Sequence, residues 1–508
     1  MSLLAAANVA TPPIDWLAVA PVIALAVAAI AIILLRALVR RANWVYDASL
    51  LIAFVGVAAA AVFLAEQWSK IRDVGSYDAI GGMVAVDGFA VFLGVVVLVA
   101  TALVLLLSSE YLPRHGFESK PEYVALLLFS ATGMLMMTTA NDLIVVFLAL
   151  ETLSIPLYVL AAFDRRRRRS LEAGMKYFVL GAFSSAVFLY GVALTYGATG
   201  TTSLTGIAQF LSRNTLLDQG TLLAGMMLLL VGLGFKVAAV PFHWWTPDVY
   251  EGAPTPITAF MGSATKAAGF AALLRIFFTA FDVYRVDWRP AVWALAVLTL
   301  VVGSVAALVQ NDVKRMLAYS SINHAGYVLI GVEAANRQGL KAALFYLMVY
   351  AFMTIGSFAV VMVIARKEDA HSIDDYRGLA TRRPVIAAVF AFFLLAQAGV
   401  PPTGGFIAKL GVFGAAADAH SYVLLVIGVL ASVIAAYYYL RVILTMYGDE
   451  ATAPEGDEAE AAESAAASRR RLDLATGVVL AITAGVVLMV GILPTVLLDF
   501  ARDATLLF

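Results

Sequence analysis

The sequence predicts an all-α integral membrane protein with about fourteen transmembrane helices, two inverted five-helix repeats, and breaks in helices 7 and 12. Three observations support this fold class. Hydrophobic residues make up 62% of the 508 residues and charged residues only 14%, whereas soluble domains usually contain about 25% charged residues. Apolar runs long enough to cross a bilayer recur along the whole chain. Three pairs of similar segments also recur in the same order.

Composition excludes several function classes. A net charge of -1 argues against nucleic acid or another strongly charged partner. The chain has no cysteine, so it can build neither a disulfide framework nor a thiolate-ligated iron–sulfur cluster. We therefore expect no cofactor and no metal in this chain, and any redox chemistry should take place on another subunit.

A transmembrane helix needs roughly 20 mostly apolar residues. By that criterion fourteen helices begin near residues 16, 45, 88, 122, 142, 171, 220, 253, 290, 313, 339, 384, 420 and 472. They divide the chain into helices 1–3 (residues 1–115), a first repeat of helices 4–8 (120–280), a second repeat of helices 9–13 (290–447), a loop (448–471) and helix 14 (472–508).

The distribution of positive charge predicts the orientation. Of the 34 Lys and Arg residues, 20 lie in loops that lead from odd-numbered to even-numbered helices, eight lie on the opposite side, and six lie within helices. Lys and Arg accumulate in cytoplasmic loops, and "DRRRRRS" (164–170) is the clearest such marker. Both termini should therefore face outward. The Ala- and Glu-rich segment 449–468 is expected to be a solvated cytoplasmic loop.

The repeats are visible as paired segments. "NDLIVVFLALETLSIPLYVL" (141–160) matches "NDVKRMLAYSSINHAGYVLI" (311–330), and "EAGMKYFVLGAF" from residue 172 matches "KAALFYLMVYAF" from residue 341. A third pair is "AAVPFHWW" from residue 238 and "AGVPPTGG" from residue 398. Because an odd number of helices separates each pair, the second copy crosses the membrane in the opposite sense. Inverted repeats with interrupted helices are typical of transporters that bind ions near the break.

Charged residues within the apolar helices are the candidate functional groups: Glu151, Lys176, Lys236, Lys266 and Lys409. A charge at a helix centre costs about 2.5–3.5 kcal/mol on insertion scales. Lys236 and Lys266 fall near the midplane of the bilayer, whereas Lys176 lies near its cytoplasmic face. One structural Glu–Lys pair is an alternative explanation, but it leaves the other lysines without carboxylates. Burial favours the neutral form of a lysine, so these groups are suited to exchanging protons.

Prolines and glycines break two of these helices. Pro241 and the pair 401–402 free backbone groups that lipid cannot satisfy, so protein or water must lie beside them. His243 and His324 carry a side chain that can relay protons, although a lone helical histidine can also be structural.

Other polar and aromatic residues receive structural interpretations. Trp244, Trp245 and Trp288 are predicted to anchor the protein at the membrane interface. Arg275 and Arg441 are predicted to extend toward the interface or to set topology.

These motifs resemble a known family. The segment "FKVAAVPFHWWTPDVYEGAPTPITAFMGSATKAAGFAALLR" (235–275) resembles the signature of the antiporter-like membrane subunits of proton-pumping NADH:quinone oxidoreductase, respiratory complex I. The part "PDVYEGAPTP" is similar to the N-type subunit. Relatives of the L and M types, and of Mrp cation/proton antiporters, tend to read "LPDAHVEAPT" there. The resemblance covers roughly residues 120–445.

The resemblance implies roles for individual residues. Glu151 matches the glutamate of helix 5 that pairs with the lysine of helix 7, here Lys236. Lys176 and Lys266 match lysines of helices 6 and 8 on the proton route. Lys409 matches the charged residue of broken helix 12, where M-type subunits usually carry glutamate.

We therefore expect a proton-translocating subunit in a bacterial cell membrane. NADH:quinone electron transfer in partner subunits, which hold the flavin, iron–sulfur clusters and quinone, would drive protons through Glu151 and the lysines, with His324 before Lys409. One alternative is a subunit of an Mrp-type antiporter. Another is a scaffold that transports nothing.

Overall fold

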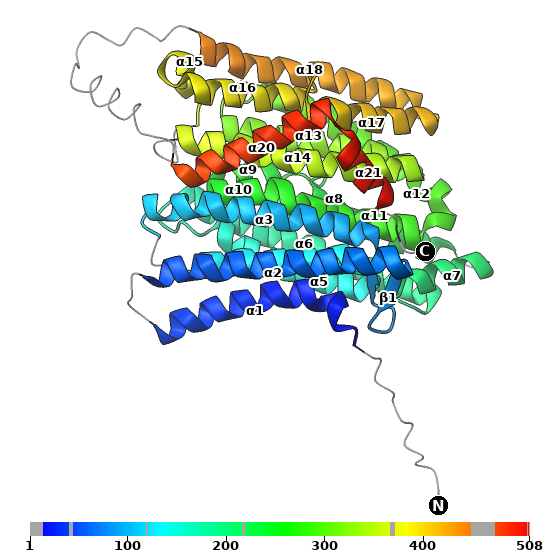
Figure 1. Cartoon of the computed structure of the whole chain (residues 1–508). Helices are drawn as coiled ribbons and strands as arrows, with labels where there is room; N and C mark the ends of the chain where they lie inside the picture. The colour runs from blue at the N-terminus through cyan, green and yellow to red at the C-terminus, as the bar shows by residue number, and fades with distance from the viewer. Residues whose placement is uncertain are drawn as a thin grey trace, which may run out of the picture.

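The computed structural model describes residues 14–39, 44–117, 120–215, 219–365, 371–448, 473–504 and 506. Most of these residues belong to helices that run side by side in one bundle (Figure 1). The all-α fold predicted from the composition is confirmed. The predicted loop 449–468 lies outside the described residues.

The chain before the first repeat forms three long helices and a hairpin: α1 (Trp16–Leu38), α2 (Trp44–Val74), β1 (Tyr77–Ala79), β2 (Val84–Val86) and α3 (Gly88–Arg114). The two strands pair antiparallel, with Tyr77 opposite Val86. Aspartates begin two of the helices. Asp15 accepts a hydrogen bond from the backbone N–H of Leu17 in α1, and Asp87 accepts one from Ala90 in α3. Such caps satisfy N–H groups that have no partner within the helix.

The first repeat contains its helices in this order: α4 (Glu122–Thr139), α5 (Leu143–Ala161), α6 (Arg168–Thr199), α7 (Leu204–Arg213), α8 (Gln219–Val237), α9 (Trp245–Gly252), α10 (Thr255–Phe260), η1 (Met261–Thr265), α11 (Lys266–Arg275), η2 (Ile276–Ala280) and η3 (Asp282–Tyr284). The break predicted around Pro241 separates α8 from α9. Ala238 has a φ of +63°, which ends the helical path. A π-helical turn, η1, directly precedes Lys266, and such turns are frequent at functional sites.

The second repeat and the chain after it follow as α12 (Arg285–Leu308), α13 (Val313–Glu333), α14 (Arg337–Ile364), η4 (Ile373–Tyr376), α15 (Leu379–Arg382), α16 (Pro384–Ala398), α17 (Gly404–Asp418), α18 (Tyr422–Tyr447), α20 (Leu474–Ile492) and α21 (Thr495–Asp503). The second predicted break lies between α16 and α17. Gly399 has a φ of +90° there, a conformation that favours glycine.

The predicted helices are present. Among the described residues, twelve helices are long and apolar enough to cross a membrane, and α13 and the broken pair α16–α17 stand at the other two predicted positions. Burial differs between the outer and the central helices. Only a third of the most apolar stretch is buried in α1, α2, α18 and α20. In the segment 255–280 this stretch is completely buried, and in α14 it is 89% buried. Polar groups on the central helices are therefore shielded from lipid.

The two repeats share their local construction. Asp142 caps the start of α5 and forms an isolated antiparallel bridge with Ser203. Asp312 caps the start of α13 and forms one with Ser372. The matching positions lie 170 (312 − 142) and 169 (372 − 203) residues apart. These are the separations of the first two sequence pairs, so the repeated segments adopt the same supersecondary structure.

Three residues that were assigned to the membrane interface are buried instead. Arg275 is 1% exposed and forms a bidentate ion pair with Asp87 of α3, at 2.7 and 2.9 Å. Trp245 and Trp288 are 2% and 1% exposed, and both indole N–H groups donate to backbone carbonyls. The interface assignment is wrong for these three because their polar groups find partners inside the bundle: a distant aspartate for Arg275, and backbone carbonyls of the preceding segments for the two tryptophans. Trp244 is 72% exposed, as an anchor should be.

The buried pair should be important for stability. In Asp87→Asn, Arg275 keeps its charge and loses its counter-ion inside the bundle. We expect the free energy of unfolding to fall by about 3–5 kcal/mol, measured by thermal or denaturant unfolding in detergent. Arg377 pairs with Asp374 on the surface, so Arg377→Gln should cost less than about 1 kcal/mol. Equal losses in the free energy of unfolding would show that the buried pair contributes no more to stability than the surface pair.

Candidate functional site: a row of buried lysines

Lys236 lies in the last turn of α8, and hydroxyl groups of neighbouring helices bind its ammonium group. The residue is 4% exposed. Nζ donates a hydrogen bond to Oγ of Ser154 on α5 at 2.8 Å and to OH of Tyr177 on α6 at 3.3 Å. Nζ also lies 5.5 Å from the centre of the Tyr177 ring, whose π face attracts a cation. Neutral oxygens therefore hold this lysine.

Glu151 does not form a direct ion pair with Lys236 among the described residues. The hydroxyl of Ser154, one turn further along α5, takes the place in contact with the ammonium group. Oε1 of Glu151 is buried and has no hydrogen-bond partner in the described structure. The pairing implied by the family resemblance is thus not a direct contact here, and Ser154 of the same helix binds the ammonium group.

Lys266 begins α11, beside Lys236. It is 2% exposed, and its Nζ donates to the backbone oxygen of Ser321 on α13 at 2.5 Å and to Oγ of the same residue at 2.6 Å. The aliphatic chain of Lys236 packs against Gly269, which lies one turn after Lys266 on α11. A Cβ at this glycine would lie 3.4 Å from Cγ of Lys236. Two lysines from adjacent helices are therefore neighbours in the centre of the bundle.

His324 lies on α13 within a cluster of tyrosines. Its Nδ1 is 2.7 Å from OH of Tyr346, and its Nε2 is 3.2 Å from OH of Tyr439. Its ring stacks on Tyr350 with centroids 4.6 Å apart, and Nζ of Lys266 lies 5.7 Å from the centre of that same ring. Both nitrogens of the imidazole are thus hydrogen-bonded to groups that can donate or accept a proton.

Lys409 lies on α17, directly after the second helix break. It is 5% exposed, and its Nζ donates to the backbone oxygen of Ala398 at 2.8 Å. That carbonyl ends α16, where the helix dipole and the unpaired C=O groups favour a cation. Nζ also lies 4.7 Å from the centre of the Tyr327 ring. The break therefore supplies the acceptor for the lysine, and burial rules out a side chain that extends to the membrane surface.

These residues form one row through the bundle: Lys236, Lys266, His324 and Lys409. The last step runs through stacked rings, since Tyr346 binds His324 and stacks on Tyr327 with centroids 6.0 Å apart. Among the described residues, none of the three lysines forms an ion pair with a carboxylate. His243 is buried and packs on Trp244, and no described hydrogen bond joins it to the row.

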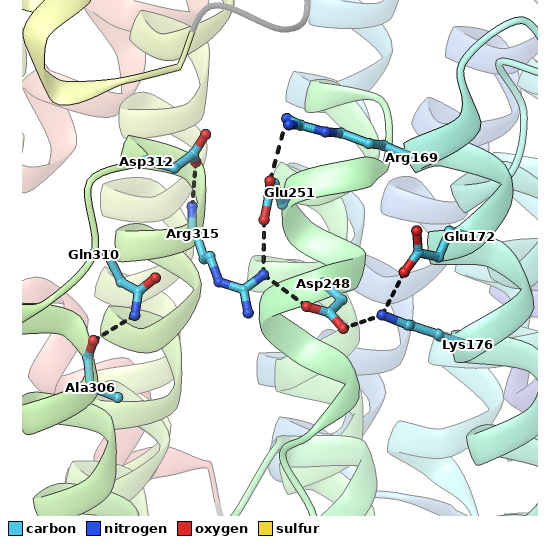
Figure 2. A network of polar contacts seen from close by, with 9 residues as sticks. All are labelled: Arg169, Glu172, Lys176, Asp248, Glu251, Ala306, Gln310, Asp312 and Arg315. Carbon is cyan, nitrogen blue, oxygen red and sulfur yellow. Dashed lines mark hydrogen bonds and ion pairs between the residues drawn. The ribbon is translucent and has the colours of Figure 1, made fainter.

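Lys176 stands apart from the row, in a network of charged side chains from α6, α9 and α13 (Figure 2). Its Nζ contacts Asp248 of α9 at 2.6 Å and Glu172 at 2.7 Å. Arg315 of α13 binds Asp248 at 2.7 Å and Glu251 at 2.8 Å. Because Asp248 and Glu251 share one face of α9, they join the first repeat to the second.

The network contains a carboxyl group that stays charged at neutral pH. Asp248 lies on α9, between two spanning helices. Burial by itself would raise the pKa of Asp248, but hydrogen bonds from Lys176 and Arg315 hold it below its usual value. Lys176, half-exposed, therefore contacts two carboxylates, in contrast to the lysines of the row.

Several functional candidates escape sequence analysis. They are the residues that bind or flank the row: Ser154, Tyr177, Ser321, Tyr327, Tyr346, Tyr350, Gln397 and Tyr439. A tyrosine in an apolar helix cannot be told from a packing residue until its neighbours are known. The acidic residues of "PDVYEG" are a visible signal in retrospect, since two carboxylates one turn apart follow the break directly.

Comparison with known proteins agrees with this architecture. A family described as "NADH:quinone oxidoreductase/Mrp antiporter, TM" matches residues 140–435. NADH-quinone oxidoreductase subunit N of Rhodococcus opacus is 41% identical, over 99% of this chain and 98% of the relative. The chain belongs to this family. Subunit N of Mycobacterium tuberculosis is also 41% identical, over 97% of this chain and 98% of its own length. The predicted resemblance, including the N type, is confirmed.

Solved structures share the same fold. A chain of respiratory complex I from Thermus thermophilus has a TM-score of 0.77 at 34% identity and covers 96% of this chain and 100% of its own. A chain of the Mrp complex from Dietzia sp. has a TM-score of 0.80 at 22% identity, over 97% of both chains. The second likeness is one of fold alone. The likeness to the complex I chain, together with the sequence relatives, groups this chain with subunit N.

The hydroxyl groups around His324 should be functionally important. Tyr346→Phe keeps the ring that packs on Tyr327 but leaves Nδ1 of His324 unpaired, which costs about 1–3 kcal/mol for a buried group. We expect slower proton transfer and a lower unfolding temperature, measured by proton uptake in vesicles and by thermal unfolding. Tyr437 is exposed to the surroundings of the bundle, so Tyr437→Phe should leave both unchanged. Wild-type transfer in Tyr346→Phe would remove this hydroxyl from the route.

Proposed function

We propose that this chain translocates protons as the N-type membrane subunit of NADH:quinone oxidoreductase. The observation that carries the proposal is the row of three buried lysines, each hydrogen-bonded to neutral groups. A buried ammonium without a counter-ion is costly, whereas a neutral amine is tolerated. Each lysine can therefore hold or release a proton in response to small changes in its electrostatic surroundings.

The residues of the row have complementary roles. Lys236, Lys266 and Lys409 would hold protons in turn. His324, bonded at both nitrogens, would relay between Lys266 and Lys409 through hydroxyl groups that can donate and accept. Glu151 would bias the first lysine, because an opposite charge nearby favours the charged form of a lysine. Because Ser154, and not Glu151, binds the ammonium group, this bias can change without breaking a direct ion pair.

The energy for transport would come from other subunits. Flavin, iron–sulfur clusters and quinone belong to partner subunits in this proposal, and this chain catalyses no redox step. Electron transfer there would alter the electrostatics along the membrane and move charge toward or away from Glu151. The chain would thus act in an oxidoreductase as its translocating part, in contact with other membrane and peripheral subunits and with lipid.

The direction of the route follows from the charges. Lys176 lies near the start of α6, which begins at Arg168 within the basic run 164–170 of the predicted cytoplasmic side. Protons would enter from this side beside the charged network of Lys176 and leave near Lys409. This is the order we propose, in a bacterial cell membrane with both termini outside.

An Mrp-type antiporter subunit is the alternative. The shared fold supports it, but the sequence relatives at 41% identity carry the name of subunit N, whereas the Mrp chain is 22% identical. Sodium-dependent proton flux in the absence of NADH would favour the antiporter.

Lys409→Arg tests the proposal directly. Arginine keeps the charge but scarcely releases a proton, since its pKa lies near 12.5–13.8. We expect NADH-driven proton pumping through this step to fall by on the order of a hundredfold, the usual contribution of a positioned proton donor. The measurement compares pumping and quinone reduction in membranes with equal amounts of assembled complex.

Lys341 provides the matched control for Lys409→Arg. It lies near the start of α14, outside the row of lysines, so the Lys341→Arg variant should pump protons normally. Normal pumping by Lys409→Arg as well would reduce Lys409 to a structural role.

Orientation can be tested by cysteine labelling. The chain has no native cysteine, so a single introduced one reports alone. In intact cells, an impermeant maleimide should label Asp503→Cys but not Arg168→Cys, and inverted vesicles should give the reverse. Labelling of both positions from the same side would refute the proposed topology.

A further inference from the structure

An open cavity of about 710 Å³ lies between the ends of α1, α4, α5 and α6. It is distinct from the row of lysines, and nothing in the proton route uses it. Its size falls within the usual range for a small-molecule site, about 300–1,000 Å³. It lies at the end of the bundle that carries residues 164–170, and its lining changes from basic to apolar.

The basic part of the cavity carries excess positive charge. Arg36, Lys120 and Arg165 line it together with one carboxylate, Glu122, so the net charge is +2 (three cations and one anion). Glu122 lies 3.6 Å from Arg36. Within the described ranges, neither Lys120 nor Arg165, both exposed, forms an ion pair. Two cations are therefore available to an anionic group.

The apolar part of the cavity extends along one face of α6. Leu171, Met175 and Phe178 line it and are 45%, 64% and 52% exposed. Their spacing of four and three residues places them in a stripe on one side of the helix. Val159 of α5, 47% exposed, faces the same space. A ligand that fits must carry a long apolar portion beneath an anionic head.

We propose that this cavity binds an anionic phospholipid of the cytoplasmic leaflet. Its phosphate would lie between Lys120 and Arg165, where charge-assisted hydrogen bonds form, and its acyl chains would cover the stripe on α6. Basic pockets between transmembrane helices on the cytoplasmic side recognise such head groups. A zwitterionic lipid would offset the same phosphate with its own cation and would gain less from the excess charge.

The site also lies close to Lys236. Tyr158 lines the cavity, and its ring centroid is 4.8 Å from that of Tyr177, whose hydroxyl accepts a hydrogen bond from Lys236. A bound lipid would thus cover the side of the bundle next to the first lysine of the row and keep water away from it.

The test uses the assembled complex in nanodiscs of phosphatidylcholine. One sample contains a diazirine-labelled phosphatidylglycerol and the other an equally labelled phosphatidylcholine. After illumination, mass spectrometry locates the cross-linked peptides. We expect the anionic probe to label the ends of α1, α4, α5 and α6, and the zwitterionic probe to label them far less. Equal labelling by the two probes would overturn the proposal, as would cross-links that show a neighbouring subunit filling the cavity.

Variants separate charge from shape. Lys120→Gln/Arg165→Gln should weaken binding of the anionic probe by about 25-fold, since each cation near the surface contributes about fivefold. Arg168→Gln/Arg213→Gln removes the same charge outside the cavity lining and should bind normally. Met175→Trp should reduce labelling by narrowing the apolar stripe at constant charge. If the Arg168/Arg213 control loses as much binding of the anionic probe, the effect comes from general surface charge and the proposed site is refuted.

Discussion

The structure depends on keeping lysine ammonium groups inside an apolar bundle. An isolated charge in such surroundings is disfavoured unless hydrogen bonds compensate for lost water. At each lysine of the row the compensation is a neutral oxygen from another helix: Ser154 for Lys236, Ser321 for Lys266 and the Ala398 carbonyl for Lys409. A carboxylate in direct contact would hold the lysine in its charged form. A neutral acceptor also stabilises the charged form, but it leaves the lysine able to lose its proton.

The helix breaks follow from the same requirement. A regular helix uses its interior carbonyls for its own hydrogen bonds, whereas the last carbonyls of a helix have no partner within it. By ending α16 at Ala398, the chain frees a carbonyl deep in the bundle and gives it to Lys409. Gly399, with its positive φ, makes the turn possible, and a Cβ there would lie 2.9 Å from Cδ of Lys409. The break and the lysine are therefore one structural unit.

The two classes of charge in this protein have different chemistry. Asp87 and Arg275 form a buried, bidentate pair that fixes α3 against α11, and the network of Lys176, Asp248, Arg315 and Glu251 joins the two repeats at one end. In these groups opposite charges contact each other directly. Within the part of the chain that the structure describes, the row has no carboxylate contacts, so its members can change charge. Paired charges set the framework, and lysines with neutral partners can carry the protons.

The sequence by itself determined the membrane class, the positions of the helices, the repeats and the candidate lysines, because hydropathy, charge and proline are local properties read along the chain. It did not reveal the partners. Arg275 was assigned to the membrane interface although Asp87, 188 residues away, pairs with it. Glu151 was expected to pair with Lys236, but Ser154 of the same helix binds the ammonium group instead. Only the tertiary structure decides which distant hydroxyl, ring or carboxylate meets a buried charge, because that depends on how helices remote in sequence pack together.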